Sequence, residues 1–273
     1  MNNKTFSKKI TAVTLTLCMM LALLPAFELP AKAAVVGAFD VTGGTLGTNY
    51  TYANNTLTII SSGTYTIGME SPGAKTMTDR IVVTPGVTAT ITLNNVSIDM
   101  TGKTDRDAFS ISSYNTTVNT TVTLTLTGAN TLIGSAGGAG IQVPHSAGFE
   151  NKLVINGTGS LTAQGGYGRA GIGGGSNNSI SGTITIDSGT VTATGGEFGA
   201  GIGGGVGGSQ AGAITINGGT VVASGGYWAA GLGGGSGVEF GAVSGSAGVV
   251  NITGGRVTAT GGVDSAGIGG GYS

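Results

Sequence analysis

The stretch GTVTATGGEFGAGIGGG, residues Gly189–Gly205, decides how the chain folds. Nearly half of it is glycine, which is typical of a flexible linker, yet its apolar residues recur in register with those of the neighbouring stretches. Each stretch ends in an aliphatic residue followed by glycines, and these residues lie 30, 30 and 36 positions apart. They are Ile172, Ile202, Leu232 and Ile268. A fixed period in this range indicates a stack of structural repeats.

Polar and apolar residues alternate within each repeat, as in Thr183–Ile186 and Thr190–Thr194. Alternation with β-branched residues predicts short strands, and the glycines between them predict corners. Each repeat has three such strand-like pieces, and no window shows a sustained helical period. The sequence therefore predicts an all-β fold: a single-stranded parallel β-helix, or solenoid, with three short strands in each coil of about 30 residues.

The same alternation continues upstream with less regularity, as in Leu57–Ile59, Ile91–Ile98 and Leu124–Thr127. We therefore expect one solenoid domain over residues 34–273, with irregular coils in 34–150 and regular glycine-rich repeats in 151–273. The chain stops at Gly-Gly-Gly-Tyr-Ser, directly after the last strand of a coil. Because an open solenoid end exposes unpaired strand edges, we expect a C-terminally truncated chain, or end-to-end stacking with further repeats.

The N-terminus has the pattern of a secretory signal peptide. Lys4, Lys8 and Lys9 precede an apolar run over residues 10–27, and Ala31-Lys32-Ala33 forms a small-residue cleavage site. We expect residues 1–33 to be removed and the protein to be secreted or held at the cell surface. An N-terminal membrane anchor is the alternative. No second long apolar run follows, so the sequence predicts no later membrane span.

Removal of residues 1–33 leaves a chain without cysteine, because Cys18 lies in the apolar run. Export without disulfides is typical of a bacterial extracellular protein that is stabilised by stacking. Seven basic residues remain (eleven less Lys4, Lys8, Lys9 and Lys32), and eleven acidic ones (twelve less Glu28), which gives 7 − 11 = −4. A net negative charge argues against nucleic acid or an anionic membrane as the partner.

The repeats resemble those of secreted or cell-surface proteins of Gram-positive bacteria. The resemblance rests on ITINGGTVVASGG (214–226), GAGIGGG (199–205) and the upstream coils ATITLNNVSID (89–99) and TVTLTLTGANTL (121–132). These coils look like a β-helical carbohydrate-binding family that is related in shape to polysaccharide lyases. The resemblance covers about residues 57–271 and implies binding of plant or bacterial wall polysaccharide, sometimes with calcium, without lyase activity.

Candidate catalytic residues are few. His145 is the only histidine, so nucleophilic triads and histidine metal clusters are poorly provided for. The best acidic group is Asp99, Asp105 and Asp107, which could offer oxygens to calcium or lie in a solvated loop. We therefore predict no required cofactor, with calcium at these three aspartates as the open alternative.

An aromatic corner is the more informative feature. Alignment of the repeats puts Tyr167, Phe198, Tyr227 and Trp228 at the same corner of successive coils, where they would form a ridge. Aromatic faces accept the apolar face of a sugar ring, and nearby polar groups fix its orientation. The alternative is that these rings only shield glycine-rich backbone. The same corner carries three polar candidates for carbohydrate binding: Arg169, Glu197 and Asp264.

The sequence thus favours a non-catalytic extracellular β-helix that binds polysaccharide or serves as a surface adhesin or stalk. A calcium-dependent polysaccharide lyase and a purely structural repeat scaffold are the alternatives. Outward threonine files would suit ice binding, but other residues interrupt them, and cross-strand stacking explains the threonines equally well. The interrupting residues are Gln164, Val222, Ser224 and Arg256.

Overall fold

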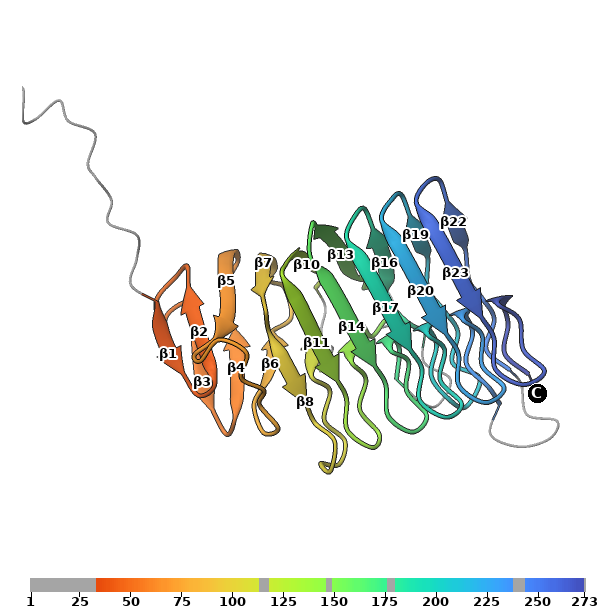
Figure 1. Ribbon diagram of the computed structural model, residues 1–273, viewed down its shortest axis with the longest axis horizontal. Helices are drawn as coiled ribbons and strands as arrows, with labels where there is room; N and C mark the ends of the chain where they lie inside the picture. Colours follow the sequence, from red (N-terminus) through yellow and green to blue (C-terminus); the bar gives the residue numbers. More distant parts are fainter. Residues whose placement is uncertain (1–32, 113–117, 146–148, 176–179, 238–243, 273) are drawn as a thin grey trace, which may run out of the picture. The chain divides into compact units, whose positions relative to one another are not determined.

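The computed structural model describes residues 33–112, 118–145, 149–175, 180–237 and 244–272. Residues 33–273 form one compact unit. The expected signal peptide, apart from Ala33, lies outside the described residues, and so does the C-terminal Ser273. All regular elements in the described part are β-strands, arranged in three sheets (Figure 1).

Sheet A has nine strands and sheet C has six. In spatial order, sheet A consists of β1 (Ala34–Val36), β2 (Phe39–Thr42), β5 (Gly63–Met69), β7 (Thr88–Asn94), β10 (Thr120–Thr127), β13 (Asn151–Gly157), β16 (Thr183–Ile186), β19 (Ile214–Ile216) and β22 (Val250–Ile252). Sheet C consists of β8 (Ser97–Asp99), β11 (Ala129–Ile133), β14 (Ser160–Gln164), β17 (Thr190–Thr194), β20 (Thr220–Ser224) and β23 (Arg256–Thr260).

Sheet B also has nine strands. In spatial order it consists of β3 (Tyr50–Ala53), β4 (Thr56–Ile59), β6 (Arg80–Val83), β9 (Phe109–Ile111), β12 (Ile141–Gln142), β15 (Ile172–Gly173), β18 (Ile202–Gly203), β21 (Leu232–Gly233) and β24 (Ile268–Gly269). From β7 onward the chain visits sheets A, C and B in turn, so each coil contributes one strand to each sheet.

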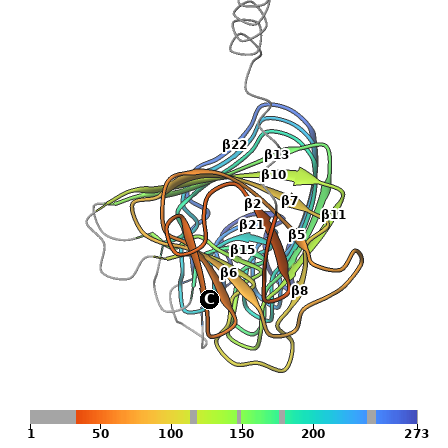
Figure 2. The ribbon, with the colours of Figure 1, turned by 90° about the vertical axis from the view of Figure 1, so that its left-hand side faces the viewer.

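Successive coils pair in parallel and in register. In sheet B, Ile141 pairs with Ile172, Ile172 with Ile202, Ile202 with Leu232 and Leu232 with Ile268, at spacings of 31, 30, 30 and 36 residues. Figure 2 looks along the stack, where the coils overlie one another. The predicted parallel β-helix with three strands per coil and about 30 residues per coil is confirmed.

Apolar side chains from the three sheets fill the interior of the coils. Every second residue of β10 is buried, as the alternation predicts. Ile172, Ile202 and Leu232 have no exposed surface, and each packs into the same continuous core. Because burial of a large aliphatic side chain contributes about 1.5–3 kcal/mol, this column supplies much of the stability that each coil lacks by itself.

Glycine is required where coils touch backbone to backbone. Gly203 follows the buried isoleucine of its coil and has a φ of 137°. A Cβ at this position would overlap the carbonyl oxygen of Gly233 in the next coil. The glycine runs are therefore contact surfaces between coils, which explains why a chain so rich in glycine is ordered.

The first strands differ from the irregular coils expected from residue 34. β1 pairs with β2 antiparallel, β2 with β5 antiparallel, and β3 with β4 antiparallel. Asn54 and Asn55 connect β3 to β4 and both have positive φ, as a type I′ hairpin turn requires. These hairpins cover the N-terminal end of the core, so parallel stacking begins at β4 and β5.

The apolar residues of the last described coil are partly exposed. Ile268 occupies the position of the buried Ile202 but is 49% exposed, and Ile252 is also exposed.

The described part of the chain contains no helix with the length and hydropathy that a membrane span requires.

Candidate functional site

One edge of the solenoid carries the predicted aromatic residues. It lies where the chain passes from sheet C to sheet B, and we call it the C–B corner. Two residues form its tip in each coil, four and five positions before the paired aliphatic residue of sheet B. The tip pairs are Thr104–Asp105, Ala136–Gly137, Tyr167–Gly168, Glu197–Phe198, Tyr227–Trp228 and Val263–Asp264.

The corner is rigid because its backbone is bonded from coil to coil. The amide of Gly168 donates to the carbonyl of Glu197 at 2.7 Å, and the amide of Gly196 donates to the carbonyl of Arg169 at 2.9 Å. A Cβ on Gly196 would overlap the carbonyl oxygen of Gly166 in the preceding coil. The residue before the tip must therefore be glycine here, whereas the tip residues project free of this contact.

The aromatic rings at the tips form a continuous series, which we call the aromatic ladder. Tyr167 lies edge-on to Phe198, with ring centroids 5.6 Å apart. Phe198 in turn contacts Tyr227 at 6.1 Å and Trp228 at 6.0 Å. Tyr167 is 57% and Tyr227 44% exposed, while Phe198 and Trp228 are half-buried. The ridge predicted from the repeat alignment is thus present as a geometric feature.

The ladder has a fifth member, Tyr272, which the repeat alignment missed. Its ring centroid lies 5.7 Å from that of Trp228, and its amide donates to the Trp228 carbonyl at 2.8 Å. Tyr272 follows the glycine run after Ile268, at the position of Val206 and Ser236 in earlier coils. Their amides make the same bond to Gly168 and Phe198. The loop after sheet B therefore folds back onto the tip of the preceding coil, which sequence spacing alone does not reveal.

Two of the ladder residues adopt a backbone conformation that aromatic residues rarely adopt. The second tip residue has positive φ in every coil, and glycine takes this position in two of them. Phe198 has a φ of 69° and Trp228 a φ of 62°. A bulky side chain in this region costs on the order of 1–3 kcal/mol, and such strain clusters at ligand-binding sites. Glycine would satisfy the corner without this cost.

The three polar residues predicted beside the ladder differ in their surroundings. Glu197 and Asp264 are exposed tip residues, and Asp264 takes the positive-φ position at 54°. Arg169 is half-buried one residue after the tip, and its charge acts on the buried Asp107 carboxylate. The exposed carboxylates therefore belong to the tips that carry or adjoin the rings, whereas Arg169 is half-buried and interacts electrostatically with Asp107.

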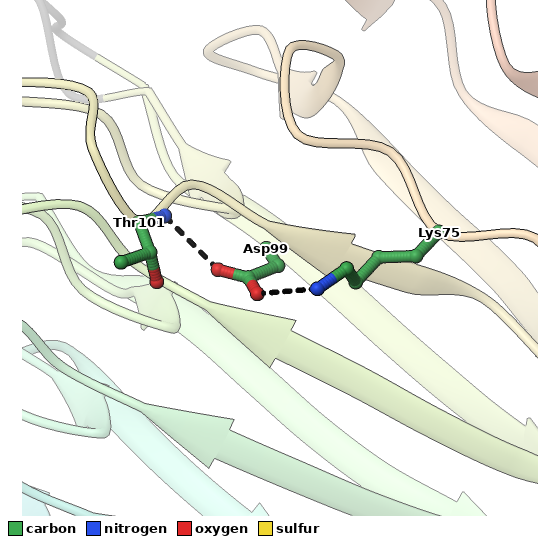
Figure 3. A network of polar contacts seen from close by, with 3 residues as sticks. All are labelled: Lys75, Asp99 and Thr101. Carbon is green, nitrogen blue, oxygen red and sulfur yellow. Dashed lines mark hydrogen bonds and ion pairs between the residues drawn. The ribbon is translucent and has the colours of Figure 1, made fainter.

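The predicted calcium site does not assemble. Asp99 accepts hydrogen bonds from the Thr101 amide at 3.0 Å and the Lys75 ammonium at 2.9 Å, and these two partners lower its pKa (Figure 3). Asp107 is buried and accepts from the Ala139 amide at 2.8 Å, and burial raises its pKa. Among the described residues, no group of three or more His, Cys, Asp or Glu side chains could hold a metal ion. Asp105 lies at the tip, so the trio forms no common cation site.

His145 lies after β12, where its amide donates to the carbonyl of Ile180 at 3.0 Å. It follows sheet B and is not a residue of any tip pair, and no metal-binding group of the described residues includes it. The structure gives it the role of a loop residue.

A pocket of about 430 Å³ opens at the N-terminal end of the same corner. Its walls include the turn at Asn54 and Asn55, the residue Arg80 at the start of β6, and the tip loop with Lys103 and Arg106. Sequence analysis did not identify this pocket, because its walls come from two separate coils and from the antiparallel hairpin.

Comparison with known proteins identifies the repeat. A family model described as Beta helix repeat matches residues 153–176, 184–206, 214–236 and 250–272. These segments begin within sheet A strands and end after sheet B strands, so each covers most of one coil. No curated protein and no solved structure matches the chain. The repeat match over these coils agrees with the parallel β-helix that the structure shows.

Proposed function

We propose that this β-helix repeat protein is an extracellular, non-catalytic binding protein that holds an extended polysaccharide along the aromatic ladder. The observation that carries the proposal is the strained backbone of Phe198 and Trp228. The corner itself needs only glycine at that position, as at Gly137 and Gly168. Aromatic residues kept there in spite of the strain support a role for their rings in ligand binding.

The spacing of the ladder suits a linear polymer that lies parallel to the solenoid axis. Corners of adjacent coils lie about 4.8 Å apart, close to the length of one sugar in an extended chain. The two exposed tyrosine rings, Tyr167 and Tyr227, lie two coils apart. In an extended β-1,4-linked chain every second sugar presents the same face in the same direction. We therefore propose a β-1,4-linked backbone over this part of the ladder, with Glu197 accepting hydrogen bonds from hydroxyl groups.

The extracellular setting rests on residues 1–33, whose basic start, apolar run and small-residue end have the pattern of a secretory signal. A bacterial cell surface, and a part in adhesion or in a stalk, follow as proposals from the same pattern. The secreted form would carry no cysteine, so its stability would come from coil stacking. N-terminal sequencing of the protein from culture medium tests this directly, with Ala34 as the expected first residue.

Retention on insoluble polysaccharide tests the binding. Cellulose, pectin and peptidoglycan are incubated with the secreted protein and with Trp228→Ala, Tyr167→Ala and a control, Val249→Ala. Val249 is an exposed apolar residue outside the corner. Wild type and the control should be retained on cellulose or peptidoglycan, whose glycan chains are β-1,4-linked, and both ring variants should be released. Retention on pectin alone, whose backbone is α-1,4-linked, would refute the β-1,4 assignment. Absence of wild-type retention on all three, or equal retention of all variants, would refute the proposal and favour a purely structural scaffold.

A further inference from the structure

The pocket at the N-terminal end of the C–B corner collects positive charge. Seven basic residues follow residue 33, and three of them, Arg80, Lys103 and Arg106, line this pocket. The described residues that line it include no acid, and its remaining walls are mostly Asn and Thr. Such clustering is unexpected in a chain whose net charge after residue 33 is negative.

None of the three basic side chains forms a direct ion pair within the described part of the protein. The single ion pair there joins Lys75 to Asp99, outside the pocket. Asp107 lies near Arg80 and Asp105 lies at the tip, but neither lines the pocket. The Asp107 carboxylate is already engaged by the Ala139 amide. The pocket thus presents unpaired cationic donors to a ligand.

Arg80 adds a donor that has no partner. Its Nε atom is buried and makes no hydrogen bond. Buried polar groups are almost always hydrogen-bonded, so an orphan guanidinium nitrogen beside a pocket calls for an acceptor from a ligand. Burial lowers the pKa of Arg80; the charge of Asp107 opposes this effect, and the charge of Arg106 adds to it. A bound oxyanion would accept a hydrogen bond from Nε and would offset the repulsion between Arg80 and Arg106. The planar guanidinium group matches the two oxygens of a carboxylate.

The position of the pocket links it to the ladder. Lys103 and Arg106 flank the tip pair Thr104–Asp105, and Thr104 bridges to Ala136 in the next coil. Ala136 precedes Tyr167 by one further coil at the same tip position. The pocket and the first exposed ring are thus about 10 Å apart, two strand spacings along one edge.

We infer that the pocket binds the carboxylate of a uronic acid residue in the polysaccharide that lies along the C–B corner. The assignment to a polymer rests on the proposed function, whereas the anion site stands on the pocket itself. The volume of about 430 Å³ is in the range of small-ligand pockets. Glu197 and Asp264 are exposed beside the ladder, and their carboxylates would repel an acidic sugar. The sugars at the ladder are therefore neutral, and the uronic acid lies only at the pocket.

The side-chain Nε–H resonance of Arg80 reports on the pocket directly. Glucuronate, glucose and inorganic phosphate are titrated into the ¹⁵N-labelled protein. Glucuronate should shift this resonance and glucose should not. Lys103→Gln and Arg106→Gln should each weaken glucuronate binding about tenfold or more, as expected for loss of a charge-assisted hydrogen bond. The control Lys152→Gln, an exposed cation on β13, should bind glucuronate as the wild type does.

The possible outcomes separate the two proposals. No shift with glucuronate, or equal weakening by Lys152→Gln, overturns the anion site. Tighter binding of phosphate than of glucuronate overturns the sugar-acid assignment, because the pocket then selects a small oxyanion. A neutral β-1,4-linked hexasaccharide should lose affinity in Trp228→Ala and keep it in Arg106→Gln. If this oligosaccharide fails to bind while glucuronate shifts Arg80, the ladder proposal fails and the anion site stands.

Discussion

The strain at Phe198 can be measured by comparing two truncations that both remove the ring. Phe198→Ala keeps a Cβ at a φ of 69°, where an L-residue costs about 1–2 kcal/mol, whereas Phe198→Gly avoids this cost. The greater freedom of glycine in the unfolded chain offsets part of the difference. We expect Phe198→Gly to be more stable than Phe198→Ala by about 1 kcal/mol.

Comparison with wild type completes the estimate. Phe198 contacts the rings of Tyr167, Tyr227 and Trp228. Each such contact contributes about 0.5–1.5 kcal/mol, so their loss outweighs the relief of strain. Phe198→Gly should therefore unfold about 1–2 kcal/mol more easily than wild type. Its affinity for polysaccharide should fall as far as that of Phe198→Ala, because neither variant carries the ring.

Urea unfolding followed by circular dichroism measures these differences, with Tyr167 as the matched control. Tyr167 belongs to the same ladder but has no positive φ. The order should therefore reverse there, with Tyr167→Ala at least as stable as Tyr167→Gly. If Phe198→Ala proved as stable as Phe198→Gly, the backbone would not be strained. The main support for a ligand-binding ladder would then be lost.

Two further predictions concern the core and the buried acids. Ile202→Ala should destabilise the protein by about 2–5 kcal/mol, whereas Ile268→Ala, at the same position but half exposed, should cost well under half as much; equal costs in thermal melts would contradict the assigned burial. The raised pKa of Asp107 means that its contribution to stability is present below about pH 3.9 and is lost as the pH rises through the folded-state pKa, so Asp107→Asn should flatten this fall. The lowered pKa of Asp99 has the opposite sign: its contribution is present above about pH 3.9 and is lost as the pH falls, so Asp99→Asn should flatten that loss instead. Melting temperatures between pH 3 and pH 8 distinguish the two, and an effect of the same sign from both substitutions would contradict the assignment.

The coil and the ladder could be predicted because both follow from the repeat. Once Ile172, Ile202, Leu232 and Ile268 are aligned, strand register and tip position are fixed by counting residues. Backbone contact between coils then restricts the residue before the tip, as at Gly196. In the regular half of the chain, the local period and the stacking geometry predict the same strands and corners, so its fold could be predicted from the sequence.

The N-terminal hairpins and the positions of Asp99, Asp105 and Asp107 do not follow from the repeat. Asn54 and Asn55 carry a hairpin signal, but it is weak against the alternation that surrounds it. Asp105 and Asp107 are two residues apart and would share a face in a regular strand. The φ of 51° at Asp105 turns the chain, so Asp105 lies at the tip and Asp107 is buried. One backbone angle, invisible in the spacing, separates the two carboxylates.

The C–B corner divides its positions into those that the fold dictates and those that it leaves open. At Gly196 any side chain would collide with the preceding coil, and at Ile202 only an apolar side chain can be buried. The tip pairs face neither demand. Their chemistry varies along the edge, from the polar pair Thr104–Asp105, which Lys103 and Arg106 flank, to the aromatic pair Tyr227–Trp228. A solenoid that needs only glycine and small residues at its tips could be built without either cluster. The fold therefore does not account for the cationic pocket and the aromatic ladder, and the proposed ligand along one edge would account for both.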